Sequence, residues 1–213
     1  MAPVVEERRA EGKDTTKHQA GPEHVIHCFE TLFSHYGNQN PPQPTFEDVY
    51  CALFVTWKKI VAGGENRLRG CIGTLEPRHL HRSLGEYTLI SALRDRRFQP
   101  IEKKEAPHLE CTVSLLTAFE SGLGWDAWDI GTHGLIIDFD DPVSGHGRSA
   151  TYLPEVAKEQ GWTKQECVDS LVQKAGYNGR VTAELREALK LTRYQSSKHS
   201  MTHEDYVAWK SSN

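Results

Sequence analysis

The chain lacks any long apolar run. No uninterrupted apolar segment in its 213 residues approaches the roughly 18 that a membrane-crossing helix needs. The N-terminal stretch, MAPVVEERRAEGKDTTKHQAG, is polar and has no apolar centre of the kind found in secretory signals. We therefore expect an intracellular protein, cytoplasmic, nuclear or both, with no membrane partner.

Cysteine is scarce and does not follow a metal or disulfide pattern. There are five cysteines, an odd number, widely spaced and without a Cys-x-x-Cys pair: Cys28, Cys51, Cys71, Cys111 and Cys167. This spacing argues against both a disulfide framework and a zinc knuckle. Two histidine groupings, His24–Cys28–His35 on one helical side and the His-x-His at 79–81, lack a carboxylate partner at a familiar spacing, so we expect no metal site.

Nucleotide and nucleic-acid signatures are missing as well. The sequence contains neither a Walker phosphate loop nor a Gly-x-Gly-x-x-Gly fingerprint, so any cofactor stays unknown. The net charge of −4 gives no overall basic footprint for nucleic acid. One local cluster, Arg94, Arg96 and Arg97, follows a predicted helix, where cations meet the negative end of the helix dipole. Nucleic-acid binding is therefore not expected.

The chain does contain interleaved helix and strand patterns. Hydrophobic residues make up 38% and charged residues 25%, which is typical of a globular protein with a substantial core. The patterns predict helices over 22–37, 80–94 and 163–176, and strands over 50–57, 67–75, 109–118, 133–140 and 188–195. Short turns, as at 62–66, join several strands, and 141–149 is expected to be a loop. This order favours an α+β fold with a mixed, largely antiparallel sheet and helices packed on it.

The predicted organisation is one folded domain with short tails. Residues 1–20 lack apolar periodicity and are expected to be a disordered N-terminal tail. Residues 21–210 form the predicted domain, and residues 211–213 form a C-terminal tail. A strand followed by a helix occurs in each half, at 70–93 and at 131–160, which hints at an internal duplication.

Residues 67–75, RLRGCIGTL, carry the clearest chemical signal. The period of two in a strand separates them into a core face, with Leu68 and Ile72, and a presented face, with Arg69, Cys71 and Gly73. The Arg69 guanidinium is expected at about 7 Å from the thiol. Gly73 is expected to leave open space beside the sulfur, and Gly70, on the core face, to let another backbone approach closely.

Cys71 has two interpretations that the sequence leaves open. A nearby positive charge lowers the pKa of a thiol, so Cys71 is a candidate for a reactive or ligand-contacting group. Alternatively, it is a small buried cysteine, and Arg69 pairs with a carboxylate elsewhere. His133, in Gly-Thr-His-Gly at a strand start, is the candidate base for Cys71. His133 is equally interpretable as a turn histidine that makes a backbone hydrogen bond.

Two further stretches place polar and aromatic residues together. In DRRFQP (95–100), Arg97 and Phe98 are candidates for contacting an anion or a planar group, although Phe98 is also suited to anchoring the loop in the core. In TYLPEVA (151–157), Pro154 is expected at a helix start, with Tyr152 as a rim residue or a hydrophobic staple. Ser114 lies on the polar face of the alternating strand at 109–118 and is a further candidate.

Several of these stretches together resemble the AMMECR family. The resemblance runs in order from about His24 to Trp209 and rests on LRGCIGT, EYTLISALRDRRFQP, LECTVSLLTAFE, DIGTHGLIIDF, YLPEVAKEQGW and LKLTRYQSSK. LRGCIGT is the hallmark of the family and is intact here, and YLPEVAKEQ resembles the eukaryotic branch. The DRRFQP and GHGRSA stretches depart from many relatives, which affects details of the rim of the site.

The resemblance implies a fold and a site. The family fold is α+β, with two related β/α repeats that contribute to a barrel-like sheet and a small lobe beside a cleft. By resemblance, the hallmark residues line that cleft, with Arg97, Phe98 and His133 nearby: Arg69, Gly70, Cys71, Gly73 and Thr74. Prokaryotic relatives are often encoded beside, or fused to, Memo-type proteins and radical SAM enzymes, which implies a shared modification or metabolic pathway.

Two functions follow as hypotheses, because the activity of the family is unsettled. In the first, the cleft around Arg69, Cys71 and Gly73 binds or modifies a small molecule or protein partner through Cys71. In the second, the same cleft belongs to a non-enzymatic adaptor or regulatory protein. The absence of an assignable base, metal set or cofactor motif leaves the choice between enzyme and adaptor open.

Overall fold

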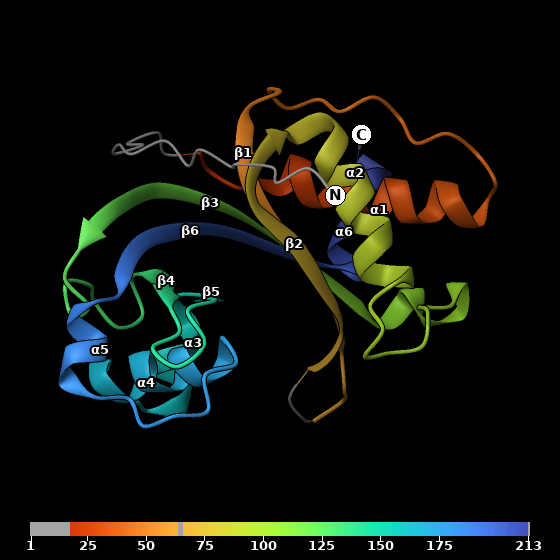
Figure 1. Ribbon diagram of the computed structural model, residues 1–213. Helices are drawn as coiled ribbons and strands as arrows, with labels where there is room; N and C mark the ends of the chain where they lie inside the picture. The colour runs from red at the N-terminus through yellow and green to blue at the C-terminus, as the bar shows by residue number, and fades with distance from the viewer. Residues whose placement is uncertain (1–17, 64–65, 213) are drawn as a thin grey trace, which may run out of the picture. The chain divides into compact units, whose positions relative to one another are not determined.

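The computed structural model describes residues 18–63 and 66–212, which form two compact units. The unit of residues 18–117 and 197–212 is called the Cys71 unit, and that of residues 118–196 the His133 unit. Helices and strands interleave along the chain (Figure 1), and the predicted α+β class is confirmed. Residues 1–17 of the predicted tail and residues 64–65 of the predicted turn lie outside the described residues.

Six strands make one hydrogen-bonded series in the order β2-β1-β3-β6-β4-β5. Their bounds are β1 Tyr50–Lys59, β2 Arg67–His79, β3 Leu109–Leu123, β4 Gly134–Asp140, β5 Gly147–Tyr152 and β6 Lys190–Thr202. β1 pairs antiparallel with β2 and β3, and β4 pairs antiparallel with β5 and β6. The antiparallel prediction is confirmed, and β2 and β5 are the outermost strands.

The Cys71 unit covers one face of its strands with helices α1 (Pro22–Tyr36), α2 (Leu80–Leu93) and α6 (His203–Ser212). α1 starts where Pro22 occupies the first turn, and it ends at Gly37 as predicted. On its apolar stripe, Val25, Phe29 and Leu32 are fully buried and pack in one cluster with Trp57 and with alternate residues of β3: Leu109, Cys111, Val113 and Leu115. The predicted inward face of 109–118 is confirmed.

The His133 unit has its own core under three short helices. These are α3 (Glu155–Gln160), α4 (Lys164–Lys174) and α5 (Ala183–Glu187). A Thr163–Glu166 capping box begins α4, since each side chain bonds the backbone N–H of the other. The buried side of α4 packs with β4 and β6 through Val168, Leu171, Val172, Leu135, Ile137 and Leu191.

Four elements were not predicted from the sequence. β5 replaces part of the loop expected at 141–149; its residues, GRSATY, are mostly polar because it is an outermost strand paired with β4 alone. The 3₁₀ helix Lys103–His108 contains Pro107, and α5 has only five residues. α6 carries little apolar periodicity, since among its residues only Tyr206 is buried. No helix within the described ranges is long and apolar enough to cross a membrane.

Candidate functional site

The backbone of Cys71 is held on the open side of β2 by two side chains from the loop after α2. The Cys71 N–H donates to Asp95 Oδ2 at 3.0 Å, and Arg97 Nη2 donates to the Cys71 carbonyl oxygen at 3.1 Å. Arg97 also donates two hydrogen bonds to the Asp95 carboxylate, from Nε to Oδ1 at 3.0 Å and from Nη2 to Oδ2 at 2.7 Å. We call this arrangement the Asp95–Arg97 clamp. It satisfies both outward polar groups of Cys71, as a neighbouring strand would.

The charges of the clamp are matched. The Asp95 side chain is 3% exposed, whereas that of Arg97 is 56% exposed. Hydrogen bonds from Arg97 hold the pKa of Asp95 well below its ordinary value, against the opposing effect of burial. The same pairing raises the pKa of Arg97. Asp95 is therefore ionised at neutral pH, and its negative charge balances the positive charge of the Arg97 guanidinium.

Cys71 differs from the other cysteines in its exposure. Its side chain is half-buried, whereas the remaining four are buried: Cys28, Cys51, Cys111 and Cys167. Thr56 Oγ1 on β1 donates a hydrogen bond to Cys71 Sγ at 3.2 Å. Thr56 lies opposite Cys71 in the β1–β2 register and opposite Thr112 in the β1–β3 register. The thiol thus begins a row of hydroxyl groups on the face away from the helices.

Arg69 has a carboxylate partner of its own. Its Nε and Nη2 donate to Glu105 Oε2 and Oε1 at 3.1 and 2.8 Å, and Nη1 donates to the Gln99 carbonyl at 3.1 Å. Hydrogen bonding from Arg69 lowers the pKa of Glu105 to about 2. This is the pairing that the second interpretation of Arg69 anticipated, and a role for Arg69 in activating the Cys71 thiol stays a prediction.

The two glycines of the hallmark meet neighbouring backbone. A β-carbon at Gly70 would lie 2.0 Å from the Ser91 carbonyl oxygen on α2, so the predicted close approach is confirmed. At Gly73 a β-carbon would lie 2.1 Å from the Leu53 carbonyl oxygen. The predicted open space beside the Cys71 sulfur is therefore wrong, because β1 fills it.

One predicted core residue of this strand is also misplaced. Leu68 was expected on the core face, yet it is 36% exposed. It lies opposite Lys58 near the start of β2, the outermost strand, just beyond a register shift between Trp57 and Lys58 that interrupts the alternation. The alternation is correct farther along, since Ile72 lies opposite the fully buried Val55.

The remaining candidates of the Cys71 unit are distributed around this strand. The Arg97 guanidinium carbon lies 5.4 Å from the centre of the half-buried Phe98 ring. Thr74 Oγ1 accepts a hydrogen bond from the Glu76 N–H, two residues farther along β2. Ser114 is 4% exposed and lies opposite Phe54 in the sheet. Contact of these residues with a ligand stays a prediction.

The other two candidates belong to the His133 unit. His133 is 9% exposed, and its Nδ1 accepts the Asp129 N–H at 2.9 Å, as expected for a turn histidine. Burial lowers its pKa, so the imidazole is mostly neutral at pH 7. The Tyr152 hydroxyl lies 3.0 Å from Ser170 Oγ, and Lys174 Nζ lies 4.5 Å from the centre of its ring. A pairing of His133 with Cys71 stays a prediction.

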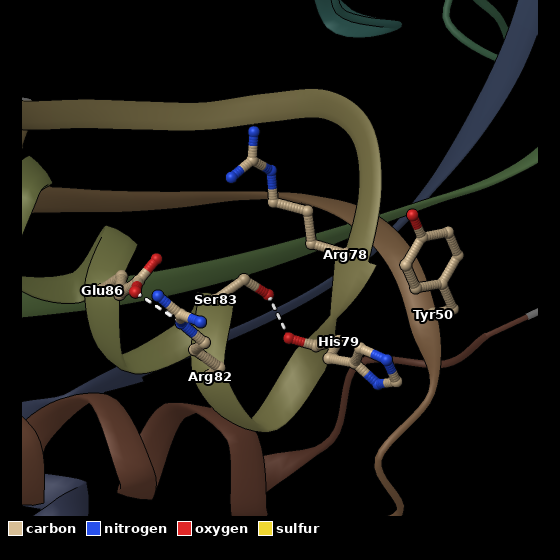
Figure 2. A pocket seen from close by; sticks show the side chains of 6 residues that line it. All are labelled: Tyr50, Arg78, His79, Arg82, Ser83 and Glu86. Carbon is tan, nitrogen blue, oxygen red and sulfur yellow. Dashed lines mark hydrogen bonds and ion pairs between the residues drawn. The ribbon is translucent and has the colours of Figure 1, made fainter. Parts of the chain in front are cut away.

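A cavity of about 260 Å³ lies at the other end of β2 (Figure 2). It is lined by Tyr50, Arg78, His79, Arg82, Ser83 and Glu86, none of which was a predicted site residue. In Figure 2 Arg82 and Glu86 point toward one another, and their Nε–Oε1 distance is 2.8 Å. Arg78 pairs with Glu76 at 2.9 Å. Both guanidiniums are thus neutralised, which gives this cavity little attraction for an anion.

A second cavity, of about 360 Å³, adjoins the ring of Phe46. Three imidazoles surround that ring, with centre-to-centre distances of 4.4 Å for His24, 5.7 Å for His27 and 5.2 Å for His81. Among residues 18–63 and 66–212, no group of three or more His, Cys, Asp or Glu side chains could hold a metal ion. The ring contacts make the three imidazoles packing partners of Phe46.

Three residues of the site were missed in the sequence. Asp95 and Glu105 hold Arg97 and Arg69, and Thr56 holds the thiol. The Asp-Arg-Arg run after a predicted helix was a usable signal for Asp95, because an acid two residues before an arginine can pair locally. The sequence holds no such signal for Thr56 and Glu105. Thr56 reaches the thiol through the β1–β2 register, and Glu105 reaches Arg69 from the 3₁₀ helix Lys103–His108.

The fold and this strand define a class: an α+β protein with an antiparallel sheet whose outer strand presents a clamped, half-exposed cysteine. The profile of the AMMECR1 family matches residues 23–199. The chain belongs to this family, as the hallmark LRGCIGT predicted.

Relatives of high identity share nearly the whole chain. An uncharacterised protein of Arabidopsis thaliana is 55% identical over 190 residues, covering 89% of each chain. An uncharacterised protein of Saccharomyces cerevisiae is 33% identical, covering 85% of this chain and 86% of its own. The crystal structure of an uncharacterised protein from Pyrococcus horikoshii matches with a TM-score of 0.67 at 25% identity, covering 84% of this chain and 89% of that one.

Proposed function

We propose that the Cys71-bearing part of β2 binds a small molecule or a protein partner, and that the Cys71 thiol contacts or reacts with it. One observation carries this proposal. Cys71 is the half-exposed cysteine in a chain whose other four are buried, and its sulfur already accepts a hydrogen bond from Thr56. A donor to sulfur stabilises developing negative charge there.

The Asp95–Arg97 clamp supports the same proposal. A binding group works best when neighbouring contacts hold it in place before the ligand arrives. Here the N–H and the C=O of Cys71 are both bonded to an ionised pair whose aspartate is buried. The clamp would keep the thiol position constant, and a partner would not need to order the strand on binding.

A non-enzymatic adaptor is the second candidate, and the state of the charges favours it. Arg69 and Arg97 are both paired with carboxylates, and the hydrogen bond found at the Cys71 sulfur, among the described residues, comes from a neutral hydroxyl. These surroundings are as compatible with a thiol that only contacts a partner as with a thiol that reacts with one. The association of family members with Memo-type and radical SAM proteins supports a partner or substrate from a modification pathway.

The proposal is tested first by native alkylation with iodoacetamide, read residue by residue by mass spectrometry. We expect Cys71 to be labelled and the buried Cys51 and Cys167, whose thiol pKa burial raises to about 11, to stay unlabelled. Thr56→Val should slow labelling of Cys71 at neutral pH. Thr112→Val, one strand farther along the same row, is the matched control and should leave the rate unchanged.

Capture of peptides and metabolites from one extract then separates the two candidates. Loss of a bound species in Cys71→Ser supports contact or reaction at the thiol. Retention in Cys71→Ser with loss in Arg69→Ala supports the adaptor. Identical capture by wild type and both variants would contradict any role of this strand in binding.

A further inference from the structure

The segment between α1 and β1 presents an unusual surface. Residues 39–49 contain no helix or strand, and in Figure 1 they run as a wide arch from the end of α1. Within them stands the sequence NPPQPTF, residues 40–46. Its first four residues are exposed, including Pro41 and Pro42, and Pro44 is half-buried.

The composition of this segment favours an extended backbone. Each proline fixes its own φ near −65°. The residue before a proline is driven out of the helical region into the extended region, which applies here to Asn40, Pro41 and Gln43. The combination is that of a polyproline II helix, with about three residues per turn and no internal hydrogen bonds.

Both ends of the segment are fastened to the Cys71 unit. At the start, the Gln39 N–H donates to the Ser34 carbonyl at 2.8 Å and closes the end of α1. At the finish, the Phe46 ring is stacked on His24 with centres 4.4 Å apart, and His81 Nε2 lies 2.6 Å from the Phe46 carbonyl oxygen. The exposed prolines are thus held between two fixed points.

We propose that Pro41 and Pro42 are a docking site for a protein domain whose aromatic-lined groove reads polyproline II segments. Such grooves gain affinity because a preformed segment loses little conformational entropy on binding. Proline rings supply flat apolar surface that packs on aromatic side chains, and the free backbone carbonyls accept hydrogen bonds. This surface is independent of Cys71 and of the function proposed for it.

The experiment is a binding screen of the purified full chain against an array of isolated SH3, WW and EVH1 domains. We expect at least one domain to bind, and the double variant Pro41→Ala/Pro42→Ala to weaken that binding by about tenfold or more. The matched control is Pro100→Ala, which alters another exposed proline in a different loop. It should bind as wild type does.

A second measurement separates docking from misfolding. Thermal unfolding of the double variant should match that of wild type, since both proline rings lie at the surface. A synthetic peptide of residues 38–48 should compete with the full chain for the same domain. Absence of binding across the array, or binding that the double variant leaves unchanged, would overturn the proposal.

Discussion

The two outermost strands, β2 and β5, are each tied down by a buried aspartate and an arginine, but in different ways. At β2 both charged residues come from the loop after α2 and bond the backbone of Cys71. At β5 the arginine stands on the strand itself: Arg148 Nε donates to Asp141 Oδ2 at 2.7 Å, and Nη1 donates to the Ala175 carbonyl after α4.

The difference concerns what each aspartate holds. Asp141 also accepts the N–H groups of Val143 and Ser144, so it closes the β4–β5 hairpin, and Arg148 joins that hairpin to the end of α4. Asp95 accepts an N–H from the outer strand itself. The Asp141–Arg148 pair at β5 therefore organises a turn. The Asp95–Arg97 clamp instead covers the open edge of β2 at Cys71, whose thiol is half-exposed.

The glycines of the two strands give the largest expected contrast. Gly70→Ala would bring a β-carbon within 2.0 Å of the Ser91 carbonyl, and we expect a loss of about 3 kcal/mol in the free energy of unfolding. Gly147→Ala on β5 meets its nearest atom, Asp140 Oδ1, at 3.9 Å and should change stability by less than about 1 kcal/mol. Urea unfolding measures both, and equal losses would show that the packing of β2 on α2 is not special.

These glycines also mark the limits of prediction from sequence. Alternation correctly divided the inner part of β2, as Gly70 and Ile72 show, because a buried face constrains every second residue. It could not reveal that β2 is outermost, which exposes Leu68, nor that β1 fills the space at Gly73. Both depend on the strand order and register, which arise from contacts distant in the sequence.

The sequence and the resemblance single out Arg69 and Cys71 as candidate residues, but not the contacts that hold them. The partners of those two, Glu105 and Thr56, were not predicted, because Glu105 comes from a 3₁₀ helix distant in the sequence and Thr56 from the register of the neighbouring strand. The family was predictable because LRGCIGT survives intact, but a function follows from partners, which a single sequence does not contain.

Removing the aspartate of each Asp–Arg pair, Asp95 or Asp141, should have the next largest effect on stability. Asp95→Ala deprives Arg97 and the Cys71 N–H of their acceptor, and we expect a loss of about 2 kcal/mol in unfolding free energy. Exchange of the Cys71 amide hydrogen and alkylation of its thiol should both become faster. Asp141→Ala should lower stability without altering either Cys71 readout. A change of Cys71 reactivity in both variants would mean that the Asp95–Arg97 clamp has no specific role.

Glu105 adds a smaller effect that depends on pH. Its folded-state pKa of about 2 lies below its ordinary value of 4.5, so its stabilising contribution is present above 4.5 and is lost as pH falls toward 2. We expect Glu105→Gln to remove about 2 kcal/mol at neutral pH and to flatten the stability profile in that window. Matched unfolding series at several pH values test this. A profile as steep as that of wild type would show that the Arg69–Glu105 pair contributes little.

Buried histidines give the smallest expected contrast between the two units. Burial lowers the folded-state pKa of His24 and His27, which pack on Phe46, and of His133 in the other unit. Each is protonated more readily when unfolded, so stability falls as pH drops below 6.5, the ordinary pKa of histidine. Around the first two, Glu23 and Glu30 oppose this shift, and His81 and His199 add to it. Around His133, Asp129 and Glu120 oppose it, and Arg193 and Lys164 add to it.

Since two such imidazoles lie in the Cys71 unit, substituting them should flatten the acid slope more than substituting one elsewhere. We expect the pair His24→Gln/His27→Gln to lose less stability between about pH 6.5 and about pH 5 than wild type does. His133→Gln, as the control, should recover a smaller part of that loss. Protection of the segment that follows Phe46 against hydrogen exchange, corrected for the intrinsic pH dependence of exchange, should fall in acid for wild type and stay constant for the pair. If His133→Gln flattens the slope more than the pair does, the acid sensitivity belongs to the His133 unit and the cluster around Phe46 is a passive contact.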